Sequence, residues 1–140
     1  MIINIASNEE IHFIGIGGIG MSGLAQVMNN MGFTIQGSDL NRNKNTERLI
    51  KSRIKVFIGH HQKNLNEVTM IVISSAIKKN NKELIAARHK KLPVFKRGEM
   101  LANIVALKKK YRNFWFTWQH YHDVFVSKYF SGSRFRSYSH

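Results

Sequence analysis

A glycine-rich turn between a predicted strand and a predicted helix constrains the fold of this chain more than any other feature. Residues 15–20 are Gly-Ile-Gly-Gly-Ile-Gly, which fits the pattern G-x-G-x-x-G. The apolar run at residues 11–16 predicts a buried strand, and apolar residues then recur at helical spacing from Met21 to Met28. We expect that helix to end near Gly32. Glycine is needed in such a tight turn because it adopts positive φ without a Cβ clash.

Strands and helices continue to alternate as far as residue 109. We predict further strands at residues 33–37, 54–58, 70–74 and 92–95, and further helices at residues 45–52, 82–91 and 98–109. Asn43 and Asn45 are both candidate N-caps for the first of these helices. Alternation with short connections predicts the α/β fold class, as a Rossmann-like, doubly wound and mainly parallel sheet.

The glycine turn also has the chemistry of a diphosphate site. A missing side chain lets backbone N–H groups approach phosphate oxygens, and a helix N-terminus adds unpaired donors and a partial positive charge. Asp39 lies at the end of the second predicted strand, two residues after Gly37 and about 20 residues beyond the turn, where an acid typically meets a ribose hydroxyl. This combination favours nucleotide diphosphate binding over a purely structural turn. It leaves an NAD(P)-binding oxidoreductase or redox-sensing domain as an alternative function.

Composition narrows the class of protein. The 140 residues include 22 Lys and Arg against 8 Asp and Glu, a formal net charge of +14. Such a charge suggests an anionic partner, but it is scattered and no nucleic-acid-binding motif accompanies it, so we interpret it mainly as solvated helix surface. Cysteine is absent, which excludes disulfides, thiolate catalysis and Cys-ligated zinc. Without a bilayer-spanning apolar run or a signal pattern, we expect a soluble cytoplasmic protein with no membrane partner.

Several sequence blocks together point to one protein family. They are the turn extended to residue 23, Gln-Gly-Ser-Asp-Leu at 36–40, Gly-His at 59–60, Val-Ile-Ser-Ser-Ala-Ile at 72–77 and Lys-Arg-Gly-Glu-Met-Leu-Ala at 96–102. In this order and spacing the blocks resemble the N-terminal domain of the Mur ligases, and within that family its alanine-adding branch. The resemblance covers residues 11–107. It implies that residues 1–110 are a domain that binds UDP-N-acetylmuramate in the synthesis of peptidoglycan precursors for the cell wall.

The resemblance also implies which residues contact the sugar nucleotide. The diphosphate cradle would be Gly15, Gly17, Gly18, Gly20, Met21 and Ser22, with Asp39 near the uridine and with Ser74, Ser75 and Ala76 lining the same crevice. Arg97 is either a phosphate or muramoyl contact or a solvated residue at a helix start. His60 and His61 have no metal-ligand partners at useful spacing and are interpreted as loop residues, and His12 as a side chain satisfied within the fold. We predict no catalytic residue and no metal ligand.

Catalysis in the resembled family lies outside this domain. ATP phosphorylates the substrate carboxylate, and the amine of alanine attacks the acyl phosphate. The ATP loop, G-T/S-H-G-K-T-T-T, opens a second domain just after the position of Lys110, and its Lys and hydroxyls serve the phosphates and Mg²⁺. No such loop stands there in this chain. We therefore expect no bound ATP or Mg²⁺ and no ligase activity from this chain alone.

Residues 111–140 form a compositionally separate tail that holds both Trp and all four Tyr. The tail lacks clear periodicity, so we expect it to be irregular. Trp has a single codon, TGG, and a reading frame shifted by one base joins its last two bases to the first base of the next codon. The T of the Phe116 codon then gives GGT and the C of the Gln119 codon gives GGC, and both encode glycine. Allowed codons then permit Gly-Ser-His-Gly-Asn-Thr-Thr-Thr, with Asn where the family loop has Lys. We predict an out-of-frame remnant of the ATP-binding domain; the alternative is an aromatic, basic module that stacks on nucleic acid.

Overall fold

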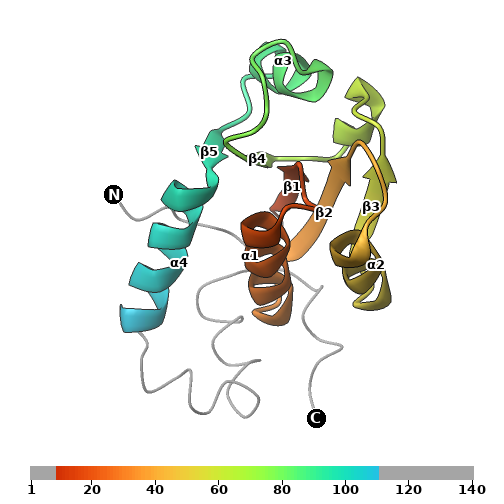
Figure 1. Ribbon diagram of the computed structural model, residues 1–140. Coiled ribbons are helices and arrows are strands. Elements are labelled where there is room, and N and C mark those ends of the chain that lie inside the picture. Colours follow the sequence, from red (N-terminus) through yellow and green to blue (C-terminus); the bar gives the residue numbers. More distant parts are fainter. Residues whose placement is uncertain (1–8, 111–140) are drawn as a thin grey trace.

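The computed structural model describes residues 9–110, and the predicted out-of-frame tail lies outside these described residues (Figure 1). The strands are β1 (Glu10–Ile14), β2 (Thr34–Asp39), β3 (Lys55–Ile58), β4 (Met70–Ile73) and β5 (Val94–Lys96). The helices are α1 (Ile19–Asn30), α2 (Lys44–Lys51), the 3₁₀ helix η1 (Gln62–Leu65), α3 (Lys82–His89) and α4 (Arg97–Lys110).

The strands form one parallel sheet in the order β3-β2-β1-β4-β5. This confirms the predicted α/β class and the parallel, doubly wound sheet. The chain moves outward from β1 to β3 and then returns to the other side of β1 with β4. The carboxyl ends of β1 and β4 therefore mark the switch point, which is where ligands bind in open sheets of this kind.

Helices cover both faces of the sheet. On one face α1 lies between α4 and α2, and its Met21, Leu24 and Met28 share a buried cluster with Ile11 and Phe13 of β1 (Figure 1). The opposite face is covered by η1 and α3. Their buried apolar residues meet those of β1 and β4 in a second cluster, made of Ile14, Leu65, Val68, Ile71, Leu84 and Ala87. Successive side chains of β1 thus point to opposite faces of the sheet, as the geometry of a strand requires.

Glycine geometry explains where the structure departs from the predicted boundaries around the turn. The first strand ends at Ile14 rather than at residue 16, because Gly15 has a φ of +86° and turns the chain out of the sheet. Helix α1 then begins at Ile19, two residues before Met21, since the extended Gly18 already caps it. Its end near Gly32, where φ is +96°, confirms the predicted stop.

Asn43 is the N-cap of α2. Its side chain accepts a hydrogen bond from the Thr46 amide at 2.8 Å, and the Thr46 hydroxyl accepts one from the Asn43 amide, also at 2.8 Å. This reciprocal capping box decides between the two candidate caps, and Asn45 lies inside the helix. The short helix η1 was not predicted, because its four residues, three of them polar, show no helical repeat of apolar side chains. No helix in residues 9–110 combines the length and the apolarity that crossing a membrane would require.

Two glycine substitutions test the packing around the turn. A Cβ on Gly37 in β2 would lie 2.5 Å from Ile16 and 2.7 Å from the Phe13 carbonyl oxygen, so we expect Gly37→Ala to lower the free energy of unfolding by roughly 1–3 kcal/mol. A Cβ on Gly23 in α1 would meet nothing within 4 Å, so Gly23→Ala should raise the same free energy by up to about 1 kcal/mol. Urea unfolding of the full chain measures both. Equal stability of the two variants would contradict this packing.

Candidate functional site

The turn between β1 and α1 is held by the end of β2. The Ser38 carbonyl oxygen accepts hydrogen bonds from the amides of Gly15 at 2.9 Å and Ile16 at 3.0 Å. The next residue, Asp39, accepts the Gly17 amide on Oδ2 at 2.7 Å. Three successive amides of the turn therefore have acceptors inside the protein. Gly15 and Gly17, both predicted to cradle a diphosphate, shape the turn and do not present these amides outward.

The middle of the turn is also closed to side chains. A Cβ on Gly17 would lie 2.7 Å from the Asp39 carboxylate, and the Gly17 carbonyl oxygen accepts the side-chain amides of Asn43 at 3.1 Å and Asn45 at 2.9 Å. The Gly18 amide turns back to its own loop, since it donates to the Gly15 carbonyl oxygen at 3.3 Å. Close approach of Asp39 thus requires the predicted glycine at position 17, whereas a Cβ on Gly18 would meet its nearest atom at an ordinary contact distance of 3.6 Å.

The donors that remain open belong to the first turn of α1. Within residues 9–110 no hydrogen bond is made by the amides of Ile19, Gly20 and Met21, whereas the Ser22 amide donates to the Gly18 carbonyl oxygen at 2.8 Å. Such groups and the helix dipole make a helix N-terminus attractive to anions. Gly20 and Met21 belong to the predicted cradle. Ile19 was missed, because the motif leaves its position unspecified and a backbone donor needs no particular side chain.

Ser22, the last residue of the predicted cradle, is turned inward. Its hydroxyl donates to the Ile19 carbonyl oxygen at 3.1 Å, and the residue is buried. Its contribution to ligand binding stays a prediction, and in this structure its visible role is to brace the first turn of α1.

Arg97, the first residue of α4, lies across the same helix start. A Cβ on Gly20 would be 3.0 Å from Cδ and Nε of Arg97 and 3.2 Å from its Cζ. The guanidinium is always charged and the helix N-terminus is partly positive, so the two groups repel one another. Among the described residues, no carboxylate forms an ion pair with Arg97. An anion placed between them would remove this repulsion, which favours the phosphate-contact interpretation of Arg97 over a merely solvated residue.

The loop after β4 forms the neighbouring wall. A Cβ on Gly15 would lie 3.2 Å from the Ser74 Cβ and 3.3 Å from the Ile77 side chain, so the loop touches the turn at the switch point. The Ala76 amide donates to Ser74 Oγ at 3.2 Å, while Ser75 and Ala76 are exposed. The structure therefore brings this loop beside the turn, as the sequence predicted. Contact of these residues with a ligand stays a prediction.

Asp39 lies against the turn with both carboxylate oxygens engaged. One oxygen holds the Gly17 amide, and the other accepts the Leu40 amide at 2.7 Å. Its main role in this structure is to fix the backbone. The predicted position near a uridine is not tested by these contacts.

A buried carboxylate that the sequence did not reveal lies behind the turn, on the α3 face. Glu83 has no exposed surface. Its oxygens accept hydrogen bonds from the Ser38 hydroxyl, His12 Nε2 (3.0 Å), His60 Nδ1 (3.2 Å), Asn64 Nδ2 (2.6 Å) and the His61 amide (3.3 Å). Its position in the first turn of a polar helix predicts only a solvated acid, since the partners are distant in the sequence.

The environment of Glu83 keeps it ionised. Burial raises the pKa of this carboxyl, but hydrogen bonding and electrostatic attraction from His12, with hydrogen bonds from Ser38 and Asn64, outweigh burial and lower the pKa from 4.5 to about 2. The other nitrogen of His12, Nδ1, lies 2.8 Å from Nε2 of Gln36, so both ring nitrogens have partners. This confirms that His12 is satisfied within the fold.

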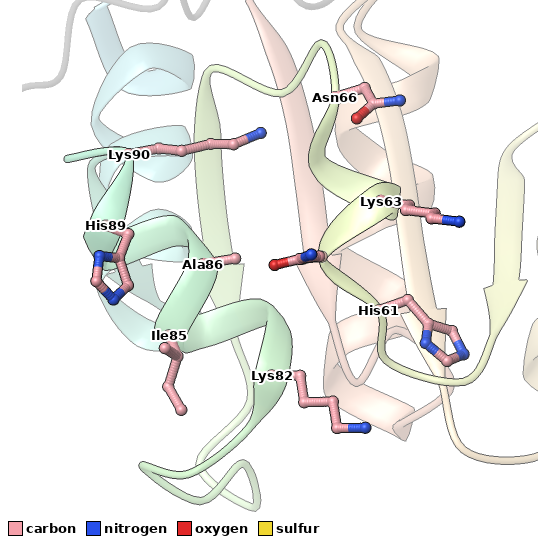
Figure 2. Close-up of a pocket in the computed structure, with 9 residues that line it drawn as sticks. His61, Lys63, Asn66, Lys82, Ile85, Ala86, His89 and Lys90 are labelled. Atoms are coloured by element: carbon pink, nitrogen blue, oxygen red, sulfur yellow. The ribbon is translucent and has the colours of Figure 1, made fainter.

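A separate groove of about 920 Å³ lies between η1 and α3 (Figure 2). It is lined by His61, Gln62, Lys63, Asn66, Lys82, Ile85, Ala86, His89 and Lys90. In Figure 2, Lys90 extends across the groove towards η1. The Lys90 ammonium donates to the Leu65 carbonyl oxygen at 3.1 Å. None of the predicted site residues lines this groove, so the candidate site is the glycine turn with Arg97.

Known proteins resemble this chain over nearly all of its described residues. A family model described as "Mur ligase family, catalytic domain" matches residues 10–109. A UDP-N-acetylmuramate–L-alanine ligase from Pelagibacter ubique is 62% identical over 109 residues, which cover 78% of this chain and 24% of the relative. A ligase of the same name from Azorhizobium caulinodans is 55% identical over 99 residues, or 71% of this chain and 21% of the relative.

A solved structure shares the fold. The crystal structure of UDP-N-acetylmuramate-alanine ligase from Thermotoga maritima has 30% sequence identity and a TM-score of 0.69, covering 71% of this chain and 23% of that chain. The present chain thus spans 24% or less of the length of these three proteins.

The ionisation of Glu83 predicts how stability depends on pH. Because the folded state lowers the pKa from 4.5 to about 2, the stabilisation is complete above pH 4.5 and is lost as the pH falls towards 2. Glu83→Gln cannot ionise. The difference in unfolding free energy between wild type and this variant should therefore shrink by roughly 3 kcal/mol on acidification. Urea unfolding across this pH range measures it, with the exposed Glu47→Gln as control. A constant difference would contradict the assigned ionisation.

Proposed function

The chain belongs to the Mur ligase family, and on that premise we propose that its described domain binds UDP-N-acetylmuramate for peptidoglycan precursor synthesis. The diphosphate would lie at the first turn of α1. All three similar proteins described above carry this substrate in their names, and the switch point of the sheet is the position where such ligands bind.

The observation that carries this proposal is the convergence of Arg97 on the start of α1. Oxygens of a diphosphate would accept the open amides of Ile19, Gly20 and Met21. The guanidinium would add charge-assisted hydrogen bonds from the other side and neutralise the ligand. Neither the guanidinium nor the helix start needs to move far, because the Arg97 side chain already lies beside Gly20.

The contacts of Asp39 favour a sugar nucleotide over NAD(P). In a dinucleotide site the acid at this position accepts ribose hydroxyls. Here both Asp39 oxygens hold backbone amides of the protein itself. The similar proteins are ligases rather than oxidoreductases, which supports the same choice.

This role is substrate binding within a ligase reaction. Mur ligases depend on ATP, whose phosphates and Mg²⁺ require a lysine and hydroxyls in a phosphate loop. We assign no such contact to residues 9–110. What these residues do is bind the diphosphate, orient the sugar nucleotide at the switch point and hold the turn in shape.

Substitution of Arg97 tests the binding proposal. Arg97→Met keeps the aliphatic length but removes the charge, so we expect the Kd for UDP-N-acetylmuramate to rise about 10- to 100-fold. Arg88→Met removes an exposed charge from the last turn of α3 and is the matched control, with no expected change. Titration calorimetry on the full chain measures both, with NADH as a competitor that should not displace the sugar nucleotide. Unchanged affinity of the Arg97 variant, or displacement by NADH, would contradict the assignment.

We also propose that residues 111–140, which lie outside the described residues, are translated out of frame. The support is the pair of glycines that the shifted frame imposes at the two Trp codons, in the positions that the family ATP loop requires. Sequencing the DNA downstream of the Lys108 codon should reveal a ligase-like continuation in the shifted frame. A shifted frame without that continuation would overturn this proposal and favour a genuine aromatic module.

A further inference from the structure

We infer that Glu83 is a positioning residue for the glycine turn, acting from α3 through Ser38. Glu83 is distant from the open amides of α1 and is not proposed to touch a ligand. Its effect on binding rests on the function proposed above, whereas its effect on the turn does not.

The two oxygens of Ser38 connect the carboxylate to the turn. The Ser38 hydroxyl donates to Glu83, and both residues are without exposed surface. The Ser38 carbonyl oxygen accepts the amides of Gly15 and Ile16 at 2.9 and 3.0 Å. One residue therefore hydrogen-bonds to α3 with its side chain and holds the first half of the turn with its backbone.

On the β1 side the strand ladder ends at this point, whereas on the other side Ser38 still pairs with Phe57 of β3. Ser38 pairs with Ile14, which is the last residue of β1, so no further rung of the β1–β2 ladder holds Ser38 beyond it. A buried hydroxyl needs a hydrogen-bonding partner, and a bond to an ionised acceptor is roughly twice as strong as a neutral one. The ionised carboxylate of Glu83 thus anchors the Ser38 side chain at the end of β2.

The carboxylate itself is prevented from swinging away. His60 and Asn64, on the segment that joins β3 to β4, donate to it from one side, and His12 of β1 donates from another. Donors on β1, β2 and this segment surround one acceptor. A shift of Ser38 away from Glu83 would therefore break its bond to the ionised acceptor. The ring nitrogens near the same hydroxyl, His60 Nδ1 at 2.9 Å and His12 Nε2 at 3.4 Å, carry no negative charge and could replace it only with a weaker bond.

Displacement of Ser38 would reach the whole turn. The following residue, Asp39, holds the Gly17 amide at 2.7 Å, so residues 38 and 39 together supply the acceptors for three successive amides. The turn leads directly into the first residues of α1. If the Ser38 and Asp39 acceptors were displaced, the turn would shift, and the open amides of α1 would change their position relative to Arg97.

Amide hydrogen exchange on the full chain, without added ligand, tests the effect on the turn. We expect Glu83→Gln to speed exchange of the Gly15 and Ile16 amides at least about tenfold relative to the Ile71 amide, as expected when a hydrogen bond to a charged group is weakened. The Ile71 amide of β4 is bonded to the Pro93 carbonyl oxygen, just before β5, and reports global opening.

Leu84→Ala is the matched control for this measurement. Leu84 is the neighbouring residue on α3 and is buried in the second apolar cluster, so its truncation destabilises the fold without removing a bond to Ser38. Its Gly15-to-Ile71 exchange ratio should equal that of wild type. Should Glu83→Gln fail to fold, Ser38→Ala removes only the hydroxyl and should give the same selective acceleration. A wild-type ratio in the folded Glu83 or Ser38 variant overturns the inference.

Calorimetry with UDP-N-acetylmuramate tests the consequence for binding. At a temperature where all variants are folded, Glu83→Gln and Ser38→Ala should weaken binding about tenfold, while Leu84→Ala should bind as wild type does. Equal weakening in all three would assign the effect to stability and overturn the positioning role. If wild type itself does not bind, the proposed function fails, and the exchange measurement alone decides whether Glu83 positions the turn.

Discussion

The ionised carboxylate of Glu83, buried beside the carboxyl end of the sheet, is the interaction on which the rest of this structure depends. An ionised group in the interior is tolerated only when its oxygens are fully hydrogen-bonded. Here the donors come from β1, from β2 and from the segment after β3, while the acceptor comes from α3. Elements that are distant in sequence are thereby tied together at one edge, next to the turn.

The turn divides its backbone groups between two tasks. The amides of Gly15, Ile16 and Gly17 bond inward to Ser38 and Asp39 and fix the path of the chain. The amides at the start of α1 are left without partners among residues 9–110, and the side chain of Arg97 lies beside Gly20 in the same helix turn. Fixed geometry in the first half gives the second half a defined direction, which is what recognition of a diphosphate by backbone groups requires.

Local sequence patterns predicted most of the fold but only part of the site. Apolar runs and helical spacing placed every strand and α-helix, and the switch point placed the Ser74 loop beside the turn. In the structure the first strand ends earlier and helix α1 begins earlier than predicted. Gly15 and Gly18 set these boundaries through their backbone angles, which hydrophobic periodicity does not report. Glu83 escaped prediction because its partners lie up to 71 residues away and no local pattern encodes such a contact. The approach of Arg97 to Gly20 is likewise a product of tertiary packing.

Asp39 gives the turn an acceptor of its own. With its carboxylate on the Gly17 amide, the loop has its final shape by virtue of the chain alone. The proposed sugar nucleotide would then have little ordering entropy of this loop to overcome on binding. The proposed site is therefore preorganised at this edge of the sheet, because the loop takes its shape before any ligand binds.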